Sequence, residues 1–229
     1  MGNSKKLKKI IEEIDFKKSY DAKDAVVLIK KYLSKKFDES MDLAVILGID
    51  AKKSDQLIRG VLSLPKGIGK KVKVAVFASG EDLEKAKKLG ADIFGADELV
   101  EEVKSGKIEF DKCIATPEMM SKVGTLGQIL GPKGLMPNPK LGTVTKNIEE
   151  AIKNIKSGQI EYKTDKGGIV HATIGKSSFS DQDIVNNVKF LYKELNKAKP
   201  ATSKGTFIKR IFISSTMGPG LKVDLNSVV

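Results

Sequence analysis

Hydrophobic residues near the start of the chain recur every three or four positions, and this spacing predicts two amphipathic helices. Their apolar stripes are Leu7, Ile10, Ile11 and Ile14 in the first helix and Ala25, Leu28, Ile29 and Tyr32 in the second. The period then changes to two, because apolar residues alternate with less apolar ones in SMDLAVILGI (40–49). Such alternation predicts a half-buried strand, and RGVLSL (59–64) predicts another.

Short apolar strands alternate with helices between residues 72 and 115. The strands are VKVAVFA (72–78), ADIF (91–94) and KCIA (112–115), and the helices EDLEKAKKLG (81–90) and ADELVEEVKSG (96–106) each end in a glycine. This order predicts a parallel sheet with helices on both faces. A further helix is expected near residues 145–157, after the loop GQILGPKGLMPNPKLGTV (127–144), which contains no acidic residue.

The last third of the chain returns to the pattern of the first. QIEYKT (159–164) and IVHATI (169–174) flank DKGG and predict a hairpin, while Ser180 with Asp183 is typical of the start of a long helix. The predicted strand TFIKRIFIS (206–214) is followed by STMGPG and LKVDLN. We therefore expect one discontinuous α+β domain, residues 1–66 plus 159–229, with an antiparallel sheet and helices packed on it. An α/β domain at residues 67–158 would interrupt it.

The chain is strongly basic. Its 41 Lys and Arg residues exceed its 29 Asp and Glu residues, which gives a formal charge of +12 and an isoelectric point near 9.5. The two outer segments carry +10 of this charge, so they are the better candidates for binding a polyanion such as a nucleic acid. The alternative is an ordinary soluble protein with a lysine-coated surface. Membrane attachment is disfavoured because no apolar run approaches the roughly 18 residues of a span and no signal peptide opens the chain, so we expect an intracellular protein.

The chain has one cysteine and one histidine. Cys113 lies in the apolar stretch DKCIA, where we expect a small buried hydrophobe, and a single cysteine allows no internal disulfide and no cysteine metal cluster. His171 lies in a predicted strand and has no second histidine or cysteine with which to share a metal. We therefore expect neither a metal site nor a bound cofactor.

Three short motifs suggest a nucleotide-dependent enzyme of two domains, the main alternative to a nucleic-acid-binding protein. In the first strand-to-helix turn a dinucleotide fold needs glycines, but this turn is Ser79-Gly80-Glu81-Asp82, and its carboxylates would repel a phosphate. GKSS (175–178) lacks the glycine that a phosphate loop requires five positions earlier, where Val170 stands. In GPKG (131–134) no Ser or Thr follows the lysine to hold magnesium. The motifs thus disfavour an enzyme.

Four separated motifs resemble the bacterial ribosomal protein L-one family. They are KFDES (36–40), GIDAKKSDQLIRGVLSLPKGIGK (48–70), GPKGLMPNPKLGTV (131–144) and STMGPG (215–220), and the resemblance covers essentially the whole chain. It implies a discontinuous RNA-binding domain with an inserted Rossmann-like, three-layer α/β domain that binds no dinucleotide. One departure from the family pattern is Lys66, where members often have histidine.

The resemblance also implies partners. The family binds large-subunit ribosomal RNA in the mobile stalk, assists release of deacylated tRNA from the exit site, and represses translation of its own operon by binding the mRNA leader. We accordingly expect a cytoplasmic protein of the large ribosomal subunit that is not an enzyme and is a monomer when free. The implied RNA contacts are Lys35, Lys36, Phe37, Glu39, Ser40, Lys166, His171, Ser215, Thr216, Met217 and Gly218.

The chemistry of these residues favours recognition of RNA by shape. Arg59 and Arg210 are the only arginines, so two-pronged contacts with guanine can contribute little, whereas lysines would position phosphates. Hydroxyls and glycines in STMGPG allow close, shielded hydrogen bonds to RNA. The alternatives are that STMGPG is a plain turn between strands and that Phe37 is a core residue at a helix C-terminus. Loop 127–144 is either a rigid structural loop or an acid-free surface for RNA or for the other domain.

Overall fold

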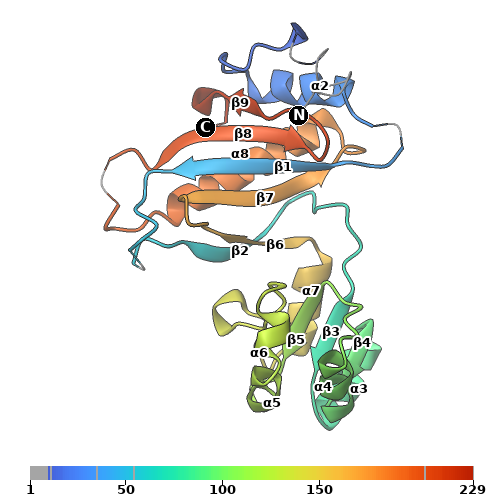
Figure 1. Cartoon of the computed structure of the whole chain (residues 1–229). Helices are drawn as coiled ribbons and strands as arrows, with labels where there is room; N and C mark the ends of the chain where they lie inside the picture. Colours follow the sequence, from blue (N-terminus) through green and yellow to red (C-terminus); the bar gives the residue numbers. More distant parts are fainter. Residues whose placement is uncertain (1–9, 11, 35, 54, 204, 229) are drawn as a thin grey trace. The chain divides into compact units, whose positions relative to one another are not determined.

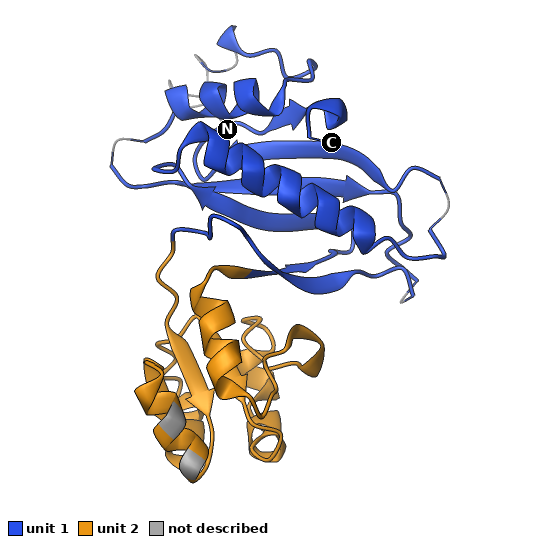
Figure 2. Ribbon diagram, turned by 180° about the vertical axis from the view of Figure 1, so that it is seen from behind, with its two compact units in different colours: residues 1–69, 160–229 blue, residues 70–159 orange. Residues whose placement is uncertain are grey.

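The computed structural model describes residues 10, 12–34, 36–53, 55–203 and 205–228, and it divides them into two compact units (Figure 2). Unit 1 combines residues 1–69 with residues 160–229, and unit 2 comprises residues 70–159. Unit 2 is thus an insertion in the sequence of unit 1. Within the described residues no helix is both long and apolar enough to cross a membrane.

Unit 1 is built around a four-stranded antiparallel sheet with the strand order β7-β1-β8-β9. Helix α8 lies behind the strands in Figure 1 and across them in the opposite view of Figure 2. Strands β2 and β6 form a separate pair. The elements are α2 (Ala22–Lys31), β1 (Ser40–Leu47), β2 (Arg59–Ser63), β6 (Gln159–Lys163), β7 (Ile169–Lys176), α8 (Asp181–Lys197), β8 (Ile208–Ser215), β9 (Leu221–Val223) and the 3-10 turn η2 (Leu225–Ser227).

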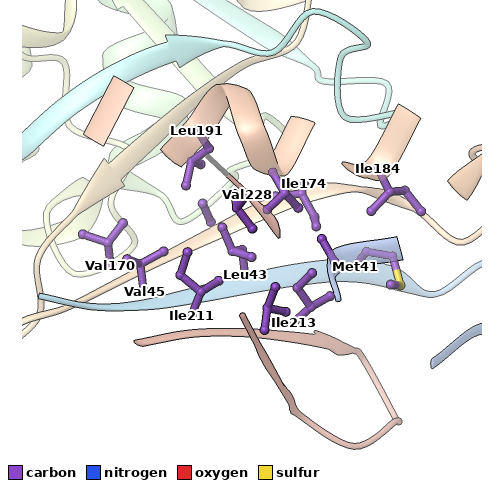
Figure 3. Close-up of a cluster of buried hydrophobic side chains, with 14 of the residues drawn as sticks. Met41, Leu43, Val45, Val170, Ile174, Ile184, Leu191, Ile211, Ile213 and Val228 are labelled. Carbon is purple, nitrogen blue, oxygen red and sulfur yellow. The ribbon is translucent and has the colours of Figure 1, made fainter. Parts of the chain in front are cut away.

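The alternation predicted for the first long strand determines which face of this sheet is buried. Met41, Leu43 and Val45 in β1 are at most 1% exposed, and their intervening neighbours are half-buried. Leu43 and Val45 pair with Ile213 and Ile211 of β8, which point to the same face. In Figure 3 these side chains meet those of α8, including Leu191. Each such aliphatic side chain stabilises the fold by about 1.5–3 kcal/mol.

The helices that cover this face follow the apolar stripes in their sequences. The Ser180 hydroxyl caps α8 by accepting a hydrogen bond from the Asp183 N–H at 3.1 Å, as predicted. Buried residues at helical spacing then line one side of α8, and Ala25 and Ile29 do the same in α2, which packs against α8. No helix among the described residues covers the opposite face of the sheet, which Figure 1 shows toward the viewer.

Unit 2 contains a three-stranded parallel sheet of order β4-β3-β5 with helices on both faces. Ala75 and Phe77 of β3 pack with α4, α5 and α6, while Val74 and Val76 pack with α3 and α7. The elements are β3 (Val74–Phe77), α3 (Glu81–Lys88), β4 (Ile93–Gly95), α4 (Asp97–Lys104), β5 (Lys112–Ala115), α5 (Met120–Gly124), α6 (Gly127–Leu130), the 3-10 turn η1 (Pro139–Leu141) and α7 (Ile148–Lys156).

Three local predictions need correction or completion. The expected hairpin around DKGG is wrong as a strand pair, because β6 pairs with β2 and β7 with β1, leaving a single bridge between Thr164 and Val170. The loop 127–144 contains α6 and η1, and buried Leu130 and Leu141 anchor it. Of the first predicted helix, Leu7 and Ile11 lie outside the described residues.

The prediction for the single cysteine is confirmed, because Cys113 is buried.

Candidate nucleic-acid interface

The predicted contact residues fall into two groups on unit 1. Segment 36–40 lies beside the turn 215–218, at the start of β1, whereas Lys166 lies in the turn 165–168 near the end of β1, where the Leu47 N–H donates to the Gly168 carbonyl. At roughly 3.3 Å per residue, the two ends of β1 are about 23 Å apart. His171 lies between the groups because it pairs with Ala44. Lys35 lies outside the described residues.

Thr216 forms hydrogen bonds with both backbone groups of Ser40. The Ser40 N–H donates to the Thr216 hydroxyl at 3.0 Å, and the Thr216 N–H donates to the Ser40 carbonyl at 3.1 Å. The hydroxyl also lies 3.4 Å from that carbonyl, to which it donates. Since a hydroxyl has two acceptor positions, Thr216, which is exposed, retains one for a ligand.

The Glu39 carboxylate joins the two segments from the inside. It is fully buried, with 0% exposure. One oxygen accepts from the Ser34 N–H at 2.5 Å, and the other accepts from the Met217 N–H at 3.0 Å. Glu39 is therefore a buried hydrogen-bond acceptor within the interface, and its side chain does not face an RNA ligand.

Asp38 joins the same segment to the connection between β7 and α8. Its carboxylate accepts hydrogen bonds from both serine hydroxyls of GKSS, Ser177 and Ser178, and from the Ser178 N–H at 3.1 Å. The Ser177 hydroxyl, with smaller contributions from Ser178 and Lys176, lowers the pKa of Asp38 below its usual value. Lys176 also donates to the Ser40 hydroxyl at 3.0 Å. GKSS thus belongs to the interface, although the sequence reasoning considered it only as a failed phosphate loop.

Two large apolar side chains stand exposed on the segments that these acids hold. Phe37 is 49% exposed and Met217 is 64% exposed, and Lys36 beside them is exposed as well. Phe37 is therefore not the core residue that one reading of KFDES allowed. An apolar pair with an adjacent cation can cover a base or a ribose and attract a phosphate.

Gly218 approaches the Ser215 side chain closely. The preceding strand turns the Ser215 side chain toward the core, where it is 4% exposed and its hydroxyl has no hydrogen-bond partner among the described residues. A Cβ atom on Gly218 would lie 2.4 Å from the Ser215 Oγ. Ser215 therefore shapes the turn from beneath and presents no hydroxyl to a ligand. The turn does connect β8 to β9, as the plainer reading of STMGPG proposed.

The face of the sheet that no described helix covers extends the site toward His171. Thr173 donates to the Asp42 carboxylate at 2.7 Å, and the half-buried Phe212 pairs with Ala44. The His171 side chain is 64% exposed, and its Nε2 lies 3.6 Å from Asp165. Arg210 and Lys222 add positive charge on neighbouring strands. The sequence could have predicted this face, because alternate residues of β1, β7 and β8 point to it.

A pocket of about 480 Å³ lies in unit 2 between α3 and the start of α7. Its lining includes the acidic Asp82 and Glu149 and the basic Lys88 and Lys146. These charges balance, so the lining has no excess of positive charge to attract a phosphate. No cluster of three or more potential metal ligands occurs in the described part of the chain.

Comparison with known proteins identifies close relatives over nearly the whole chain. Residues 29–219 match the model of the ribosomal protein L1p/L10e family. The large ribosomal subunit protein uL1 of Thiobacillus denitrificans is 56% identical over 225 residues, which cover 98% of this chain and 97% of that protein. Proteins of the same name from Janthinobacterium sp. (strain Marseille) and Legionella pneumophila (strain Corby) are 55% and 53% identical with the same coverage.

Proposed function

Because the chain belongs to the ribosomal protein L1p/L10e family, it is an RNA-binding structural protein of the large ribosomal subunit, and we propose that unit 1 forms its RNA-binding surface. Membership in this family also means that the chain is not an enzyme. Large-subunit ribosomal RNA is its partner, as the family implies.

The proposed surface consists of segment 36–40, the turn 215–218 and the uncovered face of the four-stranded sheet. The observation that carries this proposal is the convergence of two segments about 176 positions apart in sequence through the hydrogen bonds between Ser40 and Thr216. Above these bonds the surface presents exposed Lys36, Phe37 and Met217. The residues of unit 1 carry +10 of the formal charge of +12, which favours a polyanion on this unit.

Specificity on this surface would come from shape. Lysines attract phosphates irrespective of sequence, whereas the backbone near Gly218 and the remaining acceptor of Thr216 can bond riboses only where the RNA fold brings them close. The apolar side chains of Phe37 and Met217 would exclude water from these bonds, and a shielded bond is costly to lose.

Four finer elements complete the proposal. Unit 2 is an inserted Rossmann-like domain without a dinucleotide, which its parallel sheet with helices on both faces supports. The protein assists release of deacylated tRNA from the exit site, and it represses its own operon by binding the mRNA leader with the surface that binds ribosomal RNA. The free protein is a monomer. These roles rest on the family likeness.

A salt titration of RNA binding tests the proposal. Affinity for a large-subunit ribosomal RNA fragment and for a random duplex of equal length should both fall with salt, and only the fragment should keep an advantage. Thr216→Ala should reduce that advantage by roughly 1–3 kcal/mol, and the mRNA leader should compete with the fragment. Equal affinity of the wild-type protein for both RNAs would contradict the proposal.

A further inference from the structure

The acidic residue Glu39 is buried beneath the surface that we propose binds RNA. Its hydrogen bonds explain why a carboxylate is present there. We propose that Glu39 is a positioning residue for RNA recognition: without touching RNA, its carboxylate holds the segment bearing Lys36 and Phe37 against the turn bearing Met217. This inference rests on the proposed function of the same surface.

Two hydrogen bonds to the Glu39 carboxylate come from the backbone on either side of the interface. Its Oε1 accepts from the Ser34 N–H and its Oε2 from the Met217 N–H, at 2.5 and 3.0 Å. These donors are 183 positions apart in sequence, yet one side chain spans them. Because both donors are backbone groups, the carboxylate positions the main chain itself, and the placement of the Lys36 and Phe37 side chains depends on that position.

A carboxylate is suited to this role because it is acceptor-only and has two oxygens. A glutamine of the same shape offers one oxygen and one NH2 group, so one of the two N–H donors would face another donor. Hydrogen bonds to an ionised acceptor are also about twice as strong as neutral ones. The segment should therefore loosen when the charge is lost.

A direct contact with RNA is the competing explanation, and the structure opposes it. The Glu39 side chain is 0% exposed, and a carboxylate facing phosphates would be repelled. The Glu39 carboxylate thus accepts from backbone N–H groups and is buried, while Lys36 and Met217 are exposed.

The test compares Glu39→Gln with Glu12→Gln in the full-length protein. Glu12 is exposed in unit 1, so its substitution changes net charge equally without touching the interface. For Glu39→Gln we expect the affinity ratio between the ribosomal RNA fragment and the random duplex to fall about 10- to 100-fold, from loss of one or two charge-assisted bonds. The slope of log affinity against log salt should change by no more than about one unit, because Lys36 is the one phosphate-binding side chain on the loosened segment 36–40. Glu12→Gln should keep the wild-type ratio.

A second variant, Glu39→Asp, and the hydrogen-exchange rate of the Met217 amide distinguish loss of positioning from general destabilisation of the fold. Aspartate keeps the charge but is one methylene too short to span both donors, so its ratio should fall as well, and the Met217 amide should exchange faster in both Glu39 variants. A wild-type ratio in folded Glu39→Gln or Glu39→Asp, or a salt slope changed by more than about one unit, would overturn the inference. If the wild-type protein itself shows no advantage for ribosomal RNA, it is the proposed function that fails.

Discussion

The turn at Gly218 offers a prediction whose magnitude follows from one distance. In Gly218→Ala the new Cβ would lie 2.4 Å from the Ser215 Oγ, well inside normal contact. Ser215 is 4% exposed, so its hydroxyl must turn to another position inside the core or the turn must move. Overpacking of this kind costs about 1–3 kcal/mol. We expect the free energy of unfolding to fall by that amount and the advantage for ribosomal RNA to shrink with it.

Removing the clashing oxygen should reverse the effect. With Ser215→Ala, the next side-chain atom lies 3.5 Å from the new Cβ, an ordinary van der Waals contact. The single variant Ser215→Ala also deletes a buried hydroxyl that has no partner among the described residues, so it should be neutral or stabilising. The double variant should therefore recover most of the stability and RNA advantage lost in Gly218→Ala.

Urea unfolding measures the stability, and filter binding the RNA affinity, of the wild type, Gly218→Ala, Ser215→Ala and the double variant. Gly220→Ala is the matched control. A Cβ on Gly220 meets no atom within 4 Å, although it lies in the same turn. Its stability and RNA affinity should equal those of the wild type. The reasoning is refuted if Gly218→Ala behaves like Gly220→Ala, or if Ser215→Ala fails to relieve it.

Two further predictions concern the elements that support the interface. The Ser177 hydroxyl lowers the pKa of Asp38, so the stabilisation that Asp38 contributes should be present above its unfolded pKa and vanish as pH falls through its folded value. Urea midpoints of wild type and Asp38→Asn should differ near about pH 6, and this difference should begin to shrink only as pH falls below about 4, whereas exposed Asp55→Asn should track the wild type throughout. Separately, Ser180→Ala removes the cap that the Asp183 N–H uses at 3.1 Å and should lower the free energy of unfolding by about 1 kcal/mol; an unchanged urea midpoint would contradict this.

The strands and long helices were predictable because their signals are local. Alternation in SMDLAVILGI predicted β1, the apolar stripe and Ser180 predicted α8, and the strand–helix order of residues 72–115 predicted the parallel sheet. The short helices α5 and α6 were missed because glycines and a proline obscured their apolar spacing. The strand partners of β6 and β7 were also missed, since a hairpin between neighbours is only the commonest choice.

Some features of the site were within reach of the same alternation. The period that points Met41 and Leu43 inward also points Glu39 inward, and the period of Ile211 and Ile213 does so for Ser215. Extending each strand by one step would have separated these two residues from those that face a ligand. Exposed Phe37 gave no such signal, because an aromatic residue between charged ones is equally consistent with a core position.

By itself, the amino-acid sequence determined the family, the basic character of the outer segments and most of the elements, because periodicity, charge and motifs are properties of neighbouring residues. Only the tertiary structure decided that Asp38 and Glu39 hold the interface together, since Ser177, Ser178 and Met217, which donate to them, lie 139 to 178 positions away along the chain. The role of a carboxylate depends on which donors surround it and on whether water reaches it. Both are set when distant segments pack together.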